Sequence, residues 1–229
     1  EKKLLGTNPV SGEVLPEAVS FDGSSDYLSR TSDLTNNTDS KTFTFSCWVY
    51  KQDFSGTAYI YVADTNNDGD SFTVNVNSAG AVGIVGKNSS GGQIFNLGGF
   101  YISKLGWNSI LVSIDLISTS KRKVYLNDIS VTSSVAWNTY TDDTIDFTHA
   151  NHKIGNFNYQ GNFSSWFKGR LAHLFLDYTY RDLSTTSNRR LFIDADGKPS
   201  STIPSSPILY LPMTDAATAG SNSGTGGDF

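Results

Sequence analysis

The stretch TFTFSCWVYK, residues 42–51, decides the fold class. Every second side chain from 43 to 49 is apolar, and these are Phe43, Phe45, Cys47 and Val49. Because successive side chains of a strand point to opposite faces of a sheet, the pattern predicts a strand with one apolar face packed on a second layer. Cys47 belongs to the apolar set and has no second cysteine to pair with, so we expect it to be a core residue.

From residue 19 onward the chain repeats this kind of pattern. Short runs rich in Val, Ile, Tyr, Phe and Thr alternate with clusters of Gly, Asn, Asp and Ser. The predicted strands are 18–23, 26–30, 42–51, 58–64, 71–77, 81–87, 108–116, 123–128, 152–157, 169–178 and 208–213. Many short strands with close turn signals favour an all-β sandwich or barrel over alternating strands and helices.

Two further strands predict which side chains face the core. In 108–116 the inward set is Ile110, Val112, Ile114 and Leu116. In 169–178 we expect Ala172, Leu174 and Leu176 to face the core and His173 to point outward. One short helix is predicted near the C-terminus, capped by Asp182 and ending at Leu191 and Phe192.

Length and composition suggest one domain of 19–215. Residues 1–18 have the composition of a lead-in segment or linker, and residues 216–229 that of a Gly- and Ser-rich linker-like tail. We therefore expect the chain to be part of a longer protein. Lys and Arg number 17 against 22 Asp and Glu, and no long apolar run occurs. A nucleic-acid partner and membrane insertion are therefore not expected.

Three segments, in this order, resemble the concanavalin A-like, laminin G-type jelly-roll superfamily. They are VSFDGSSDYLSR with FTFSCWVY, then GWNSILVSIDLISTSKRKVYLNDI, then HKIGNFNYQGNFSSWFKGRLAHLFLDYTYRDLS. The positions that carry the likeness are Phe21 to Gly23, Trp48, Trp107, Asn127, Ile154 with Gly155, and Gly169. The resemblance implies a two-sheet antiparallel jelly-roll sandwich. The C-terminal segments DLSTTSNRRLFIDADGKP, PILYLPM and NSGTGGDF are similar to modules of bacteriophage tail and other virion appendage proteins, which implies a virion or extracellular location.

The distribution of carboxylates argues against catalysis. The superfamily includes polysaccharide-degrading enzymes, and glycosidases need a pair of carboxylates across the scissile bond. The only glutamates are Glu1, Glu13 and Glu17, all before the predicted sandwich. Aspartates occur singly in strands, as Asp115 and Asp177, or in loops. We predict no catalytic residue. His149 and His152, three residues apart, are expected to be polar loop residues rather than metal ligands.

The segment DTNNDGDSF, residues 64–72, resembles the start of a calcium loop. A helix-flanked calcium loop needs a bidentate Glu at its twelfth position, which here is Asn75, and both flanks are predicted strands. That motif is excluded. A hairpin loop remains, with oxygen-bearing side chains at Asp64, Asn66, Asp68 and Asp70. Two interpretations stay open, a calcium site and a solvated Asx-rich turn.

Two polar segments rich in aromatic residues are candidates for sugar binding, which uses aromatic rings against sugar faces and amides or carboxylates for hydroxyls. The candidate ligand-binding residues are Trp137, Asn138, Tyr140, Asp142, Asn158, Tyr159 and Trp166. Trp137 and Tyr159 are expected to be exposed, and Trp48 and Trp107 to be core residues. The alternative is that these aromatics cover sheet edges or contact a neighbouring subunit.

The sequence thus predicts a non-catalytic binding module for a carbohydrate or cell-surface glycan, within a phage tail or other virion appendage protein. An assembly domain that contacts other virion subunits without binding sugar is the alternative. A polysaccharide-degrading enzyme ranks below both.

Overall fold

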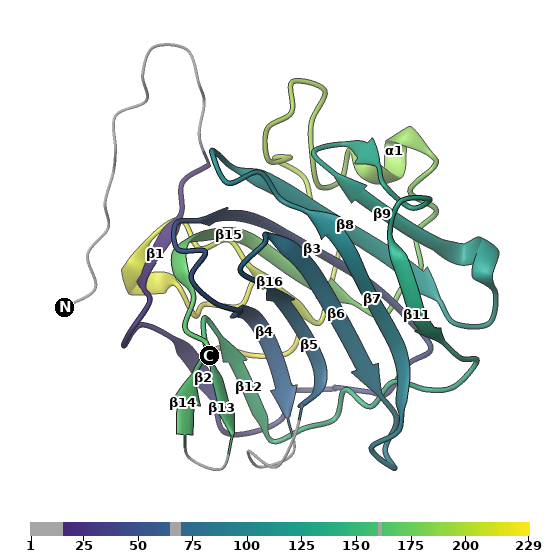
Figure 1. Ribbon diagram of the computed structural model, residues 1–229, viewed down its shortest axis with the longest axis horizontal. Coiled ribbons are helices and arrows are strands. Elements are labelled where there is room, and N and C mark those ends of the chain that lie inside the picture. The colour runs from purple at the N-terminus through teal and green to yellow at the C-terminus, as the bar shows by residue number, and fades with distance from the viewer. Residues whose placement is uncertain (1–15, 65–69, 160–161) are drawn as a thin grey trace.

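The structure, a computed structural model, describes residues 16–64, 70–159 and 162–229 and consists mainly of two antiparallel β-sheets (Figure 1). Sheet A has the order β1 (Val19–Asp22), β15 (Lys168–Asp177), β3 (Thr42–Lys51), β8 (Asn108–Asp115), β9 (Arg122–Leu126) and β10 (Ile129–Ser130), with β16 (Leu209–Leu211) also paired to β15. Sheet B has the order β11 (Ala136–Tyr140), β7 (Gln93–Tyr101), β6 (Ala81–Lys87), β5 (Asp70–Val76), β4 (Ala58–Asp64), β12 (Asn151–Ile154) and β2 (Leu28–Arg30). The expected two-sheet jelly-roll sandwich is confirmed.

The main core lies between the two sheets. The alternating residues of β3 and β8 predicted to face inward, from Phe43 to Val49 and from Ile110 to Leu116, all belong to it, and Cys47 is fully buried there. Phe43 meets Phe72 of sheet B edge-to-face at 5.1 Å and Phe95 at 5.6 Å. Burial of each such ring contributes about 1.5–3 kcal/mol, so these contacts hold the layers together.

A β-bulge in β15 changes one predicted face. The register with β3 shifts between Ala172 and Phe175, and His173 at the shift has φ of 50°. Leu174 and Leu176 face the main core as predicted, but Ala172 lies on the opposite face, beside Trp48 and Ile193. The prediction for Ala172 was wrong because a bulge inserts one residue and reverses the alternation before it.

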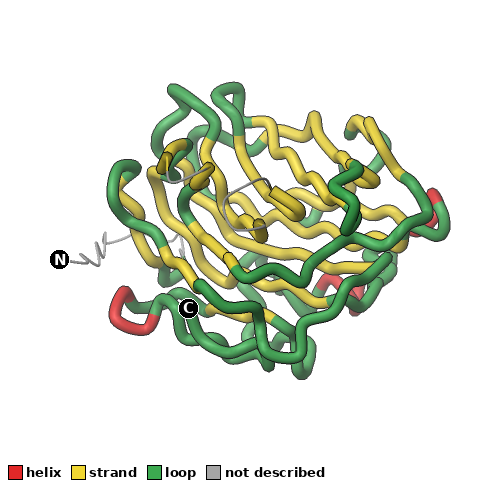
Figure 2. The backbone as a smooth tube through the Cα atoms, turned by 90° about the horizontal axis from the view of Figure 1, so that it is seen from below, coloured by secondary structure: helices red, strands yellow, loops and turns green. Residues whose placement is uncertain are grey.

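The outer face of sheet A is covered by the chain that follows β15. Leu183 and Phe192 pack against Leu111, Tyr125 and Phe175. Ile193 packs on Trp48, and Trp107 lies half-buried beside them, so both tryptophans contribute to packing outside the main core. Figure 2 shows loops and short helices gathered on one side of the strands. The chain that follows β15 does not cover the outer face of sheet B in this way. That face is therefore the candidate binding surface.

Several elements differ from the sequence prediction. Strand β7, strand β11 and the small β13 (Phe157–Tyr159) and β14 (Asn162–Ser164) hairpin were not predicted. The helix is shorter than expected, because α1 spans Thr186–Arg189 and follows Thr185, while Asp182 binds the Ser184 backbone N–H instead. Two short 3₁₀ helices complete the chain, η1 (Thr119–Lys121) and η2 (Ala216–Thr218).

The C-terminal segment is packed against the sandwich, where the sequence predicts a linker-like tail. The Gly226 N–H donates to the Ile208 carbonyl at 2.9 Å, and the ring of Phe229 packs on the main core. A Cβ at Gly226 would lie 2.5 Å from the Ile208 oxygen, and one at Gly224 would lie 2.5 Å from the Pro207 oxygen. These glycines therefore permit a close backbone approach, which composition alone does not distinguish from linker flexibility.

The glycines of the superfamily likeness also serve packing. A Cβ at Gly169 would lie 2.1 Å from the Tyr50 carbonyl oxygen, and one at Gly155 would lie 2.6 Å from the Phe21 ring. Both residues have positive φ. The motif therefore marks places where β15 and the end of β12 approach their neighbours closely. No helix in the described part of the chain is long and apolar enough to cross a membrane.

Candidate functional site

The outer face of sheet B is defined by the strand registers. Tyr59 of β4 pairs with Asn75 of β5, which pairs with Gly83 of β6. The residues flanking Asn75 and Gly83, among them Val74 and Val82, are in the main core. Side chains alternate across a sheet, so Tyr59, Asn75 and Gly83 form one row on the outer face.

Four aromatic residues lie together at the β2, β12 and β4 end of this face, and we call them the aromatic strip: Tyr27, Tyr59, Phe157 and Trp166. The rings of Tyr59 and Phe157 stack with centroids 4.8 Å apart. The Tyr59 N–H donates to the Ser165 carbonyl, which places the next residue, Trp166, beside β4. Trp166 in turn meets Tyr27 edge-to-face at 5.8 Å. Tyr27 is exposed and the other three rings are half-buried.

Amide and hydroxyl side chains occupy the other end of the face, over β7 and β11. Asn138 donates to the Asn96 side-chain oxygen at 3.3 Å, and Gln93 donates to the Thr139 hydroxyl at 3.3 Å. Between the two ends lies the polar side chain of Asn75. Its neighbour Gly83 has no side chain, so the surface there is polar and does not project. The face therefore combines aromatic rings with amide donors and acceptors.

A pocket opens at the edge of the sandwich beside the aromatic strip. It has a volume of about 110 Å³ and is lined by Val19, Ser20, Phe21, Ser25, Asp26, Tyr27, Leu28 and Ala219. The loop at its rim is fixed by Asp22, whose carboxylate accepts the backbone N–H groups of Ser24 and Ser25 at 2.8 Å each. These hydrogen bonds hold the pKa of the Asp22 carboxyl well below its usual range despite the cost of desolvation.

The predicted residues Trp137 and Tyr140 lie on the inner side of β11 and not on the outer face. The register shifts between Trp137 and Thr139, so a bulge places both rings against Phe95, at 6.3 and 6.1 Å. The Arg122 guanidinium lies 4.8 Å from the Trp137 ring centre, and the Tyr140 hydroxyl donates to the Asp115 carbonyl at 2.7 Å. Burial raises the pKa of Tyr140. Trp137, expected to be exposed, is half-buried and closes the edge of the sandwich.

The remaining predicted ligand residues are spread over the molecule. Asn138 is exposed on the outer face, and Trp166 belongs to the aromatic strip. Asp142 is away from both, in an exposed loop where it pairs with Lys41 at 2.7 Å. The side chains of Asn158 and Tyr159 lie outside the described part of the structure, although their backbones form β13. Binding by any of these residues stays a prediction.

The predicted calcium loop is described only at its two ends. The carboxylate of Asp64 is buried and lies 2.7 Å from the Lys153 ammonium. The backbone of Asp70 pairs with Asp64 across the hairpin, while Asn66, Asp68 and the side chain of Asp70 lie outside the described residues. No group of three or more His, Cys, Asp or Glu side chains suited to a metal occurs among those that are described. Calcium binding here stays a prediction.

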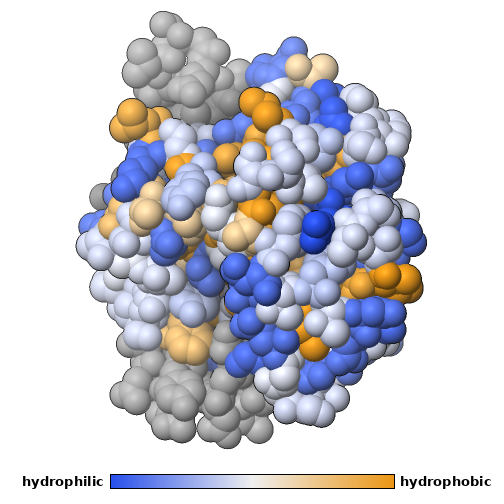
Figure 3. Space-filling view, turned by 45° about the vertical axis from the view of Figure 1, so that its right-hand side comes forward, coloured by the Kyte–Doolittle hydropathy of each residue, from blue (hydrophilic) through white to orange (hydrophobic). Residues whose placement is uncertain are grey.

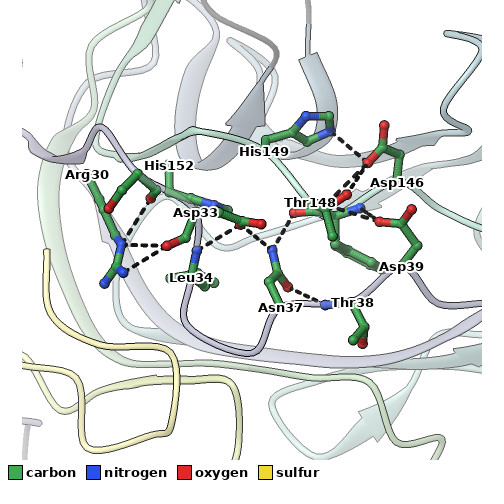
Figure 4. A network of polar contacts seen from close by, with 12 residues as sticks. Arg30, Asp33, Leu34, Asn37, Thr38, Asp39, Asp146, Thr148, His149 and His152 are labelled. Atoms are coloured by element: carbon green, nitrogen blue, oxygen red, sulfur yellow. Dashed lines mark hydrogen bonds and ion pairs between the residues drawn. The ribbon is translucent and has the colours of Figure 1, made fainter.

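His149 lies in a loop as expected and His152 lies in a strand, and the burial of both side chains corrects the expectation of solvated polar residues. His152 lies in β12, with one ring nitrogen 2.9 Å from the Tyr61 hydroxyl and the other 3.1 Å from the Asp33 carboxylate. Figure 4 shows Asp33 at the centre of this network, where it also accepts from Asn37 at 2.7 Å. His149 lies 3.4 Å from Asp146.

Sequence reasoning missed Tyr27, Tyr59 and Phe157. Tyr59 is embedded in an apolar run, where an aromatic residue is normally assigned to the core. Tyr27 and Phe157 have mostly polar or glycine neighbours and fall in the predicted strands 26–30 and 152–157, whose exposed faces the sequence does not identify. A signal for Tyr59 existed in the alternation of AYIYVAD, but alternation alone does not say which face of a strand is exposed.

The sequence matches no protein-family model, and a search of curated proteins gave no match. Similar folds occur among solved structures. The SAP-like pentraxin of Limulus polyphemus aligns with a TM-score of 0.56 and 15% identity over 80% of this chain and 85% of its own. A candidate carbohydrate-binding protein of Bacteroides ovatus aligns with a TM-score of 0.58 and 14% identity. The alignment covers 87% of this chain and 52% of that protein. The sialidase CBM40 of Ruminococcus gnavus, bound to α2,3 sialyllactose, aligns with a TM-score of 0.49 and 15% identity. The alignment covers 73% of this chain and 93% of that module.

At these identities the likeness establishes the fold alone. The fold is the two-sheet antiparallel jelly-roll sandwich that the sequence resemblance implies.

Proposed function

We propose that the chain is a non-catalytic module that binds glycans on the outer face of sheet B. The observation that carries the proposal is the aromatic strip, which lies beside Asn75 on the outer face of sheet B. The amides of Asn96 and Asn138 lie at the other end of the same face. The C–H faces of a sugar stack on aromatic rings, while its hydroxyls exchange hydrogen bonds with amides. Both kinds of group are present on the outer face of sheet B.

The state of the strand carboxylates supports a non-catalytic role. Asp64 pairs with Lys153 at 2.7 Å, Asp115 with Lys121 at 2.8 Å, and Asp177 with Arg181 at 2.6 Å. A glycosidase needs one carboxylic acid that gives up a proton and a second carboxylate across the sugar. Each of these three carboxylates already contacts a basic side chain and, among the described residues, does not face a second carboxylate across an open site. We therefore rank a polysaccharide-degrading enzyme below a binding module and an assembly domain.

The biological setting is part of the proposal. The likeness of the C-terminal segments to phage tail and virion appendage modules supports a setting in a virion or outside the cell, where a glycan-binding face would recognise a cell surface. An assembly domain is the alternative. Among the described residues the most exposed large apolar side chains are Leu105, Ile129 and Ile117, and Figure 3 shows small separate hydrophobic patches on the face it draws. Protein-contact surfaces more often have one large apolar patch.

Glycan-array binding of the purified chain tests the proposal. The variants Tyr59→Ser and Tyr27→Ser each remove one ring of the aromatic strip, and Tyr180→Ser removes a tyrosine beside Lys121 on the sheet A side. We expect the wild type and Tyr180→Ser to bind the same glycans and the two strip variants to lose them. A folded wild-type protein that binds no glycan, or strip variants that bind as the wild type does, would overturn the proposal. Release of reducing ends from a bound polysaccharide would favour the enzyme.

A further inference from the structure

The pocket beside the aromatic strip has an apolar floor. Val19, Phe21, Leu28 and Ala219 line it, and each of them is at least nine-tenths buried. The floor is formed by β1, the start of β2 and the chain after η2, so it belongs to the rigid frame of the sandwich. An apolar cavity of about 150 Å³ holds a benzene molecule. A pocket of about 110 Å³ therefore suits a group of roughly four heavy atoms with an apolar end.

The rim of the pocket offers hydrogen-bond acceptors. Asp26 accepts the Asp22 N–H through Oδ2 at 3.0 Å, and no described residue donates to its Oδ1. The Ser25 hydroxyl donates to Asp22 at 2.7 Å, so only its lone pairs are left for a ligand. A ligand at this rim is expected to donate a hydrogen bond, and an anionic group would be repelled by Asp26.

The mouth of the pocket is continuous with the aromatic strip. Tyr27 lines the pocket and is 38% exposed, and its ring also contacts Trp166. A ring that stacks on the strip can therefore place one of its substituents in the pocket.

We infer that this pocket takes the acetamido group of an N-acetylated amino sugar. The acetyl methyl group fills the apolar floor, the amide N–H donates to Asp26 Oδ1, and the sugar ring lies against Tyr27. An acetamido group has four heavy atoms, an apolar methyl group and one N–H donor, which match the floor and the rim. Its carbonyl oxygen is an acceptor that the rim does not serve, so it points out of the pocket toward solvent. This inference rests on the proposed glycan binding and adds the class of sugar that the site selects.

Saturation-transfer NMR with free N-acetylglucosamine and glucose tests the inference, because the two probes differ in the acetamido group. We expect the strongest transfer at the acetyl methyl protons, and an affinity for N-acetylglucosamine at least tenfold above that for glucose. Ala219→Leu fills the floor without changing the rim, while Ala217→Leu adds the same side chain to an exposed residue of η2. Only Ala219→Leu should abolish the methyl signal.

Asp26→Asn provides a second variant that keeps the size of the side chain and removes its charge. We expect it to lower the affinity for N-acetylglucosamine about tenfold and to leave that for glucose unchanged, with thermal melting as the check on folding. Equal binding of both sugars, lost in Tyr59→Ser, would overturn the acetamido assignment and leave the proposed function standing. If the array is also silent, the proposed function fails with it. Array hits that lack acetamido groups would again overturn only the assignment.

Discussion

The ring of Phe157 stacks on the ring of Tyr59, with centroids 4.8 Å apart and planes 21° apart. Phe157 belongs to the β13–β14 hairpin and Tyr59 to β4, so this contact joins the hairpin to the outer face of sheet B. It also fixes two rings of the aromatic strip relative to each other. The geometry of the candidate site therefore depends on a tertiary contact between segments almost one hundred residues apart.

A double-mutant cycle measures that contact. We expect Tyr59→Ala and Phe157→Ala to couple by about 0.5–1.5 kcal/mol in the free energy of unfolding, the range typical of aromatic pairs. Urea unfolding of the four proteins provides the value. Purely additive effects would show that the stack does not hold the hairpin in place, and a control cycle of Tyr59→Ala with the distant Leu105→Ala should be additive.

The sequence pattern was sufficient for the strands that build the core, because regular alternation in β3 and β8 identifies their faces directly. It failed where alternation is interrupted. Strand β7 was missed because Gly98 and Gly99 divide its apolar residues, and glycine is normally a turn signal. Bulges at His173 and Asn138 reverse the alternation, and a bulge in a strand cannot be placed from its residues alone.

The candidate site was harder to predict than the fold. Polar neighbours suggested that Trp137 is exposed, but the bulge turns its ring toward Phe95 and Arg122. Tyr59 faces solvent because β4 lies in the sheet whose outer face the C-terminal segment does not cover, which depends on topology. Trp166 was predicted from composition, while its neighbour Tyr27 comes from a distant strand end.

Trp137 is expected to contribute to stability through contacts at the sandwich edge. Its indole packs on Tyr140 at 5.7 Å, stacks under Arg122, and donates to the Thr132 carbonyl at 3.3 Å. We expect Trp137→Ala to lower the free energy of unfolding by about 2 kcal/mol, less than for a fully buried tryptophan. Asn138→Ala, one residue away and exposed, should change it by less than about 0.5 kcal/mol. Equal effects in chemical denaturation would contradict this placement of the indole.

The Tyr61 hydroxyl is expected to stabilise the fold by forming a hydrogen bond with the buried His152. Tyr61→Phe keeps the ring but leaves one imidazole nitrogen, now 2.9 Å from the hydroxyl, without that partner. An unsatisfied buried polar group costs about 1–3 kcal/mol, so we expect a loss of that size in thermal or urea unfolding. Tyr101→Phe removes a hydroxyl from a residue that is 59% exposed and should have no measurable effect. A stable Tyr61→Phe protein would mean that water replaces the hydroxyl.

Calcium is expected to leave the melting temperature of the wild-type protein unchanged. The Lys153 ammonium, 2.7 Å from Asp64, neutralises the one loop carboxylate whose position is described and competes with a metal ion for it. Lys153→Met removes this competition and leaves a buried carboxylate, a change that typically costs about 3–5 kcal/mol. Calcium at millimolar concentration should then raise the melting temperature of the variant. A calcium-dependent rise in the wild type that Asp68→Ala abolishes would instead establish the loop as a metal site.

Lys51 is expected to make stability depend on pH. Its ammonium is buried at the end of β3, where it donates to the carbonyls of Gly56 at 2.9 Å and of Val76 and Asn77 at 3.2 Å each. Burial, together with the charge of Lys104, lowers the pKa of Lys51 from 10.5 to about 8, against an opposing contribution from Asp53. Above pH 8 the unfolded chain therefore holds a proton at this residue that the folded chain has released.

Proton linkage decides whether Lys51 raises or lowers stability as the pH increases. Stability rises with pH wherever the unfolded state binds more protons, so the contribution of Lys51 increases between about pH 8 and about pH 9.5, below the range in which unfolded tyrosines ionise. Urea unfolding across this window should show a free energy of unfolding that rises with pH relative to that of Lys51→Met, because ionisation of Cys47 in the unfolded chain lowers stability equally in both proteins. Lys51→Met should be less stable, because three carbonyls lose their donor, and should lack this rise. Lys198→Met, in the turn after Asp194, should keep the wild-type slope. The same slope in Lys51→Met would show that the ammonium stays charged in the folded protein.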